Sequence, residues 1–273
     1  MPVDAEGRVD EDDAADSADR ARSRGVPGDP GGPAGDAVVT ARRALVVRGG
    51  WDGHRPVEAT DLFLPFLADN GFEVRVEDSN EIYADREEMD RTDLIVQSVT
   101  MSEISNEALT GLRGAVERGT GLAGWHGGIA DSYRNSSDYL QLVGGQFATH
   151  PAKHPDAREG GEADNFLCYT VDLTDLGREH EIMTGVEDFT LRTEQYWVLT
   201  DDLNDVLATT THPVQPFHPW HRPITSPAVW TRQWGKGRVF VATPGHSLVV
   251  LRDTSVRTII ERGMLWASRT ASE

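Results

Sequence analysis

Short apolar runs alternate with amphipathic stretches in the first half of this chain, and this alternation constrains the fold more than any other feature. Apolar runs of four or five residues suit buried strands, whereas apolar residues spaced three and four apart suit helices. The expected strands are 44–47, 72–76, 93–96 and 121–125, and the expected helices are 57–70 and 105–119. Strands joined by helices pair in parallel through right-handed crossovers, so the sequence predicts an α/β fold with a mostly parallel sheet.

Single residues predict where these helices begin, bend and end. Pro65 lies inside 57–70 and predicts a kink or a late start, because proline lacks the backbone N–H and clashes with the preceding turn. Ser105 is the expected N-cap of the second helix, and Gly119 is its expected end.

Beyond residue 145 the pattern is less regular. The expected elements there are strands at 206–211, 227–232 and 238–243, a tight turn at 235–237, and a closing helix at 256–267. We expect Ile259, Ile260 and Leu265 to form the buried face of that helix.

Residues 1–41 differ in composition from the rest of the chain. They are rich in Asp, Ala, Gly, Pro and Arg and contain no aromatic residue. Such a segment buries too little apolar surface to offset the entropy of ordering it. We therefore expect a disordered tail over 1–41, or a wrongly assigned start codon, and one folded domain over 42–270.

The composition limits the partners. The formal net charge of −19 disfavours nucleic acid, since binding to phosphates needs a basic surface. An arginine-rich acidic chain is typical both of salt-adapted proteins and of GC-rich genomes, and both readings stay open. The chain has no run of 18 apolar residues and no basic-then-apolar leader, so we expect a cytoplasmic protein that does not cross a membrane. Cys168 is the only cysteine, which excludes an intrachain disulfide.

The segment 121–128 carries the most informative chemistry. A buried strand ends at His126, and Gly127 and Gly128 follow at once. The carboxyl ends of parallel strands face the ligand crevice, and glycine-flanked turns of this kind hold the nucleophile in several enzyme classes. We expect His126 to face a crevice and to fill no core volume; the alternative is a structural histidine bonded to a neighbouring loop.

Two further histidines follow expected strands. His54 ends the segment that begins with Trp51 and Asp52, and His246 follows the strand at 238–243. We expect both to face the same crevice as His126. The alternative is that these segments are glycine turns needed only for their shape.

A third polar group comprises Glu194, Gln195 and Tyr196. Glu194 joins His126, His246 and His54 as a candidate catalytic residue, because His–Glu pairs transfer protons near neutral pH. The alternative is a solvated glutamate on a surface strand. The candidate substrate-binding residues are Trp51, Asp52, Trp125, Gln195 and Tyr196.

Zinc is a possible cofactor, with ligands drawn from His54, His126, His150 and His246. Tetrahedral zinc needs three or four converging donors, and the spacing of these residues does not establish convergence. The glycines match neither nucleotide-binding motif, so a nucleotide is not expected.

Taken together and in this order, several motifs resemble the ThuA-like (trehalose utilisation) family. They are 49–54, 121–128, 194–196, 234–240 and the pair Gly245-His246. The resemblance implies a flavodoxin-like, class I glutamine amidotransferase-like three-layer sandwich with additional C-terminal strands. It also implies a role in the catabolism of trehalose or a related disaccharide, with keto-sugars as suspected intermediates.

The amidotransferases of this fold class hold a cysteine nucleophile where this chain has His126, so we do not expect a glutaminase. One hypothesis is an enzyme that acts on a small-molecule sugar; the other is a non-catalytic sugar- or partner-binding protein on the same scaffold. Convergence of His126, Glu194 and His246 in one pocket would favour the enzyme. A homo-oligomer is possible.

Overall fold

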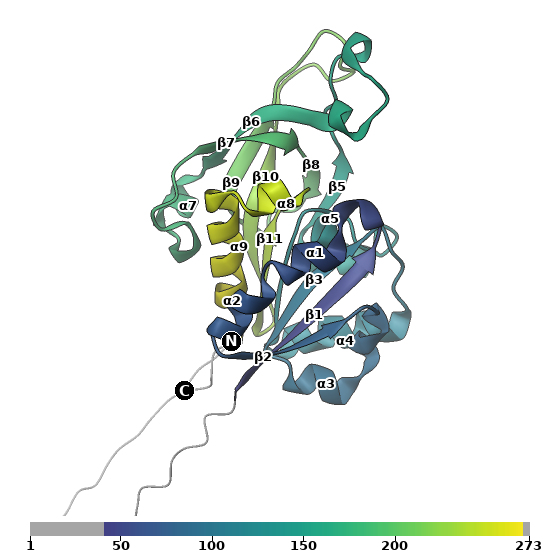
Figure 1. The fold of residues 1–273 in the computed structure, drawn as a ribbon, viewed down its shortest axis with the longest axis vertical. Coiled ribbons are helices and arrows are strands. Elements are labelled where there is room, and N and C mark those ends of the chain that lie inside the picture. Colours follow the sequence, from purple (N-terminus) through teal and green to yellow (C-terminus); the bar gives the residue numbers. More distant parts are fainter. Residues whose placement is uncertain (1–40, 270–273) are drawn as a thin grey trace, which may run out of the picture. The chain divides into compact units, whose positions relative to one another are not determined.

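The computed structural model describes residues 41–269. Most of the expected tail at 1–41 lies outside the described residues. A nine-stranded sheet with the order β2-β1-β3-β4-β11-β10-β9-β6-β7 forms the centre of the described part (Figure 1). A separate two-stranded sheet pairs β5 with β8.

The first half of the large sheet is parallel. Its strands are β2 (Phe72–Glu77), β1 (Arg42–Gly50), β3 (Leu94–Thr100), β4 (Gly121–Trp125) and β11 (Gly237–Ala242). Every neighbouring pair among them is parallel. The four expected N-terminal strands are all present, and the α/β fold class with its parallel sheet is confirmed.

The second half of the sheet is antiparallel. Its strands are β10 (Ile224–Trp234), β9 (Asp205–His212), β6 (Phe166–Leu173) and β7 (Phe189–Glu194). The small sheet consists of β5 (Gly145–Thr149) and β8 (Trp197–Thr200). The expected strands near 206, 227 and 238 are therefore present, whereas β5 to β8 fall where the sequence pattern was irregular.

The helices are mostly short. The α-helices are α1 (Pro56–Asp61), α2 (Leu64–Asp69), α3 (Arg86–Arg91), α4 (Asn106–Arg118), α5 (Gly127–Ala130), α6 (Ser137–Val143), α7 (Asp175–Glu179), α8 (Leu248–Leu251) and α9 (Thr254–Ala267). The 3-10 helices are η1 (Asp52–His54), η2 (Asn80–Ala84), η3 (Pro155–Ala157), η4 (Glu162–Asn165) and η5 (Glu181–Met183). In the described part of the chain, no helix is long and apolar enough to span a membrane.

Pro65 interrupts the expected helix over 57–70. The chain forms α1 and α2 instead, and Pro65 occupies the first turn of α2, where its missing N–H costs nothing. The Ser105 cap is present: its side-chain oxygen accepts from the N–H of Ala108 at 3.1 Å, and α4 ends at Gly119.

Hydrophobic clusters cover both faces of the sheet. One packs β1, β3 and β4 against α1, α2 and α9, and the other packs the opposite faces of these strands against α3 and α4 (Figure 1). The structure corrects one expectation for α9: Leu265 is only partly buried, and Met264 faces the core beside Ile260 instead. The fold is thus a three-layer sandwich in its parallel half, with the carboxyl ends of β1, β4 and β11 at one edge.

Candidate functional site

His126 occupies a strained turn between β4 and α5. Its backbone angles are φ 51° and ψ −142°, a region that only glycine visits without strain. Its N–H donates to the carbonyl of Ala242 on β11 at 2.7 Å, which fixes the turn against the neighbouring strand. A Cβ atom at Gly128 would lie 2.8 Å from the Cα of Ser98, so the chain passes β3 too closely for any other residue.

Each nitrogen of the His126 ring has a defined environment. Nδ1 lies 2.8 Å from the carbonyl oxygen of Thr243, which only accepts, so Nδ1 carries a proton. Nε2 lies 3.1 Å from Glu194 Oε2, 2.9 Å from the Tyr196 hydroxyl and 3.3 Å from His246 Nδ1. The side chain is almost fully buried, so the expectation that it fills no core volume is wrong.

His246 lies between two carboxylates. Its Nδ1 is 3.0 Å from Glu194 Oε2, and its Nε2 is 2.6 Å from Glu162 Oε1. His150 also reaches Glu194 Oε2, at 3.0 Å from its Nε2. One carboxylate oxygen of Glu194 therefore faces three imidazole nitrogens.

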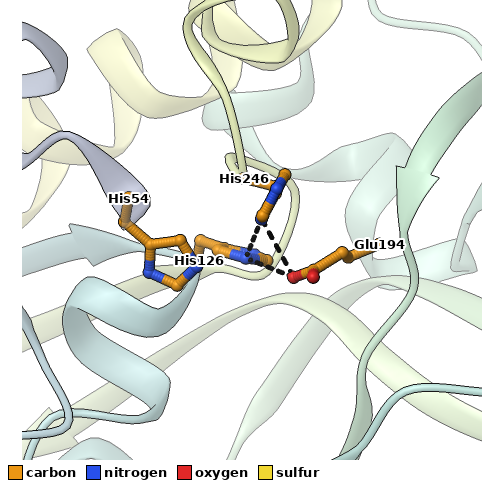
Figure 2. Close-up of side chains that lie close together, drawn as sticks. All are labelled: His54, His126, Glu194 and His246. Carbon is orange, nitrogen blue, oxygen red and sulfur yellow. Dashed lines mark hydrogen bonds and ion pairs between the residues drawn. The ribbon is translucent and has the colours of Figure 1, made fainter. Parts of the chain in front are cut away.

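His54 completes the group from the end of β1. Its Nδ1 lies 2.9 Å from the hydroxyl of Thr100, the last residue of β3. Its ring centroid is 4.6 Å from that of His126 and 5.3 Å from that of His246. Figure 2 shows the three imidazoles and the Glu194 carboxylate pointing toward one another. Sequence reasoning predicted this convergence for the histidines, because their strands end at one edge.

These four side chains form a candidate metal site, in which His126, Glu194 and His246 have the spacing of zinc ligands. One donor atom each from His54, His126, Glu194 and His246 lie within 4.8 Å of one another. With bonds of about 2.0–2.1 Å, a tetrahedral zinc site has ligand atoms about 3.3–3.4 Å apart. The three distances among His126, Glu194 and His246 are 3.1, 3.0 and 3.3 Å. Three imidazoles and one carboxylate are also a donor set that zinc favours.

The second ring nitrogen of each histidine also has the kind of partner that metal-binding histidines have. Histidine ligands of metals commonly bond a carbonyl, carboxylate or hydroxyl through the nitrogen that does not face the metal. That nitrogen of His126 bonds Thr243, that of His246 bonds Glu162, and that of His54 bonds Thr100. The expected ligand set is therefore corrected in one member: His150 contacts Glu194, and Glu194 takes its place in the cluster.

Burial and mutual contact shift the pKa values of the cluster. Burial lowers the pKa of His54 to about 3, with the neighbouring imidazoles adding to the effect. Burial also lowers the pKa of His126, although Glu194 opposes it. Burial alone would lower the pKa of His246, but its bonds to Glu194 and Glu162 raise it. Burial would raise the pKa of Glu194, yet its close contacts with the imidazoles of His126, His150 and His246 hold that pKa far below its usual range.

A cavity of about 480 Å³ lies above the cluster. His54, Glu194 and Tyr196 form part of its wall, whereas His126 and His246 lie buried beneath it. Trp51 also lines the cavity and is 44% exposed. This volume is in the range of pockets that hold small molecules, and it gives a ligand access to the cluster.

Some expected substrate-binding residues do not reach the cavity. Asp52 is exposed and lies outside the lining. Trp125 is buried and packs on Phe63 with ring centroids 4.8 Å apart. Gln195 lines a separate groove, where its amide donates to the Thr210 hydroxyl at 2.6 Å.

Other wall residues escaped sequence reasoning. Arg134 donates to both carboxylate oxygens of the buried Asp131 and lies above the Phe147 ring. Glu162 reaches the wall from a loop. None of these residues ends an expected strand of the parallel sheet. Glu162 follows the glycine pair Gly160-Gly161, but no expected strand precedes that pair, so sequence reasoning did not single it out.

The fold is that of an α/β protein of the flavodoxin-like, amidotransferase-like class, and His126 occupies the strand-end turn after β4; Cys168 is exposed on β6. The family model described as trehalose utilisation (ThuA) matches residues 43–267, and the chain belongs to this family. Its role in trehalose utilisation is thereby assigned at the level of the family.

Solved structures show the same fold. A ThuA-like protein from Bacteroides uniformis is 16% identical, with a TM-score of 0.60 over 86% of this chain and 94% of that one. A ThuA-like protein from Parabacteroides merdae is 14% identical, with a TM-score of 0.60 over 86% and 93%. A cytoplasmic protein from Salmonella typhimurium is 16% identical, with a TM-score of 0.53 over 83% and 100%. The comparison with curated protein sequences gives no match.

Proposed function

We propose that this protein is an enzyme that processes a sugar of the trehalose type, or its keto derivative, at a divalent metal centre. The observation that carries the proposal is the convergence of donor atoms from His54, His126, Glu194 and His246 within 4.8 Å, beneath a cavity. A bound zinc ion would supply Lewis acidity toward a carbonyl or hydroxyl oxygen of the ligand, which zinc can accept as a fifth donor. The four side chains would hold it, with His126 fixed by the strained turn.

The cavity wall supports a sugar as the ligand. Trp51 offers an exposed indole face, which packs well against the C–H face of a pyranose ring. Arg134 donates its Nε–H and one terminal N–H to Asp131, so three of its five N–H groups are left to donate to sugar oxygens. Together these residues offer the stacking and polar contacts that orient a ring above the cluster.

Two wall residues can move or hold protons. The Tyr196 hydroxyl lies 2.9 Å from His126 Nε2, and burial with the nearby Glu194 raises its pKa well above the usual value, so it stays protonated. His150 is partly exposed to the cavity and contacts Glu194. A histidine with solvent access on one side and a carboxylate on the other suits proton exchange with a ligand.

The experiment compares metal-free and zinc-loaded protein incubated with trehalose and with 3-keto-disaccharides, monitored by NMR. Zinc-dependent product formation, lost in Glu194→Gln, is the expected result. Binding of the sugar without turnover in either form would replace the enzyme with a sugar-binding protein. Equal turnover with and without metal would contradict the metal centre and leave His126 and Glu194 as an acid–base pair.

A further inference from the structure

Glu162 reaches the buried cluster from a surface loop. Its Oε1 lies 2.6 Å from Nε2 of His246, whose side chain is 2% exposed, while the Glu162 side chain itself is 54% exposed. It belongs to the short helix η4, and it also lines the cavity. An exposed acidic residue thus makes a short hydrogen bond to a buried histidine.

The loop that carries Glu162 is closed by its own hydrogen bonds. The carboxylate of Asp164 accepts from the N–H groups of Glu159 and Gly160 at 3.0 and 2.8 Å. The Asp164 carbonyl accepts from the N–H of Lys153 at 2.9 Å, and the Lys153 ammonium lies 3.7 Å from the Asp164 carboxylate. These bonds present Glu162 toward His246 without a regular strand or a long helix beneath it.

The chemistry of this hydrogen bond fixes the proton on His246. An ionised carboxylate only accepts, so Nε2 must carry the hydrogen. In the neutral ring Nδ1 then has the lone pair, and Nδ1 is the nitrogen that faces Glu194 and His126. We infer that Glu162 is the positioning residue that holds His246 in the tautomer able to bind the metal of the proposed centre.

The three histidines of the cluster differ in the group that bonds the ring nitrogen facing away from the proposed metal. Thr243 offers His126 a neutral carbonyl, and Thr100 offers His54 a neutral hydroxyl. Glu162 alone among these outer partners is a carboxylate, which makes its histidine a stronger donor toward the metal. It is also the only one of the three that comes from a loop rather than from a strand or strand end of the sheet. Metal affinity therefore depends on how this loop is placed over the site.

This inference rests on the proposed metal centre, and one experiment separates the two. Zinc affinity of the metal-free full chain is measured by competition with a chromogenic chelator for wild type, Glu162→Ala and Glu162→Gln. Loss of an outer carboxylate of this kind weakens metal binding by about 10–100-fold, and this is the result expected for Glu162→Ala. The zinc affinity of Glu162→Gln should lie between those of wild type and Glu162→Ala, because its amide oxygen still accepts from the Nε2–H of His246.

Glu159→Ala is the matched control, since it removes a negative charge from the same loop at an exposed position. We expect its zinc affinity to stay within about twofold of wild type, because exposed charges on a solvated loop are strongly screened. In zinc-loaded protein, the Nε2–H proton of His246 should give a slowly exchanging NMR resonance that Glu162→Ala loses and Glu159→Ala keeps. A merely structural role for Glu162 would not change that resonance selectively.

The outcomes distinguish the two claims. If wild type binds zinc and Glu162→Ala binds it equally well, the role of Glu162 is overturned while the metal centre stands. If wild type binds no zinc, the proposed centre fails and the inference fails with it. If Glu159→Ala weakens binding as much as Glu162→Ala, general loop charge rather than the hydrogen bond is responsible, and the inference is again overturned.

Discussion

The imidazole of His126 lies 3.1 Å from the carboxylate of Glu194, although 68 residues separate them in the chain. His126 ends β4 in the parallel half of the sheet, and Glu194 ends β7, the last strand of the antiparallel half. Figure 1 shows β6 and β7 in the upper part of the view, above β9 and β10. The antiparallel extension thus supplies the carboxylate that the strand-end histidines lack.

The strained backbone at His126 predicts an unusual order of stability between two variants. His126→Ala and His126→Gly both remove the imidazole, but only glycine adopts φ 51° without strain. Glycine relieves about 1–3 kcal/mol of backbone strain, but its unfolded chain has more conformational freedom than that of alanine. The His126→Gly variant should therefore be about 1 kcal/mol more stable than the His126→Ala variant. Urea denaturation of both variants checks this, and a more stable alanine variant would show that the turn is unstrained.

Gly127 packs beside the His54 ring and offers no donor atom of its own to the cluster. A Cβ atom there would lie 2.6 Å from Cε1 of the His54 ring, so Gly127→Ala should push the ring away. We expect zinc affinity at least about tenfold weaker, because metal sites tolerate little displacement of a ligand. Gly161→Ala is the control, since its Cβ would meet open space. Isothermal titration of both variants gives the comparison, and equal affinities would remove His54 from the cluster.

His212 predicts an acid-sensitive fold. It is fully buried on β9, its Nε2 lies 3.0 Å from the Tyr196 carbonyl, and burial lowers its pKa to about 4. Between pH 6.5 and pH 4, His212 is protonated in the unfolded chain but neutral in the folded chain. The free energy of unfolding therefore falls as the pH falls through this window. From pH 7 to pH 5 this residue alone should cost about 2 kcal/mol.

Denaturation of metal-free wild type and His212→Gln at both pH values tests this coupling. The glutamine variant is less stable at pH 7 but should lose less stability on acidification. Parallel losses in the two proteins would mean that His212 keeps its ordinary pKa in the folded state.

Trp51 should govern sugar affinity. Its exposed ring forms part of the cavity wall, and a stacked ring contributes about 0.5–1.5 kcal/mol, so Trp51→Ala should weaken sugar binding by about twofold to twelvefold. Trp234→Ala removes an indole that lies outside this cavity and should leave affinity unchanged. Both are measured by titration with trehalose and a keto-disaccharide, and equal losses would place the sugar elsewhere.

Sequence alone predicted the frame of the site and its histidines. Apolar runs end at one edge of a parallel sheet, so residues such as His126 and His246 were expected together. The hydrogen bond between Glu162 and His246 was not predictable from the sequence. Glu162 lies in a segment without regular periodicity, and 84 residues separate it from His246. Trp125 shows the opposite error: it adjoins His126 in sequence, but alternate residues of a strand face opposite ways, and its side chain points into the core.

Zinc titration of the metal-free protein tests the central claim most directly. Calorimetry should show one zinc ion bound per chain in wild type, with affinity at least about tenfold weaker in Glu194→Gln, which keeps the shape of the side chain but removes its charge. Glu159→Gln, at an exposed position away from the cluster, should bind as wild type does. A wild-type chain that binds no zinc, or a Glu194→Gln variant with undiminished affinity, would contradict the metal centre.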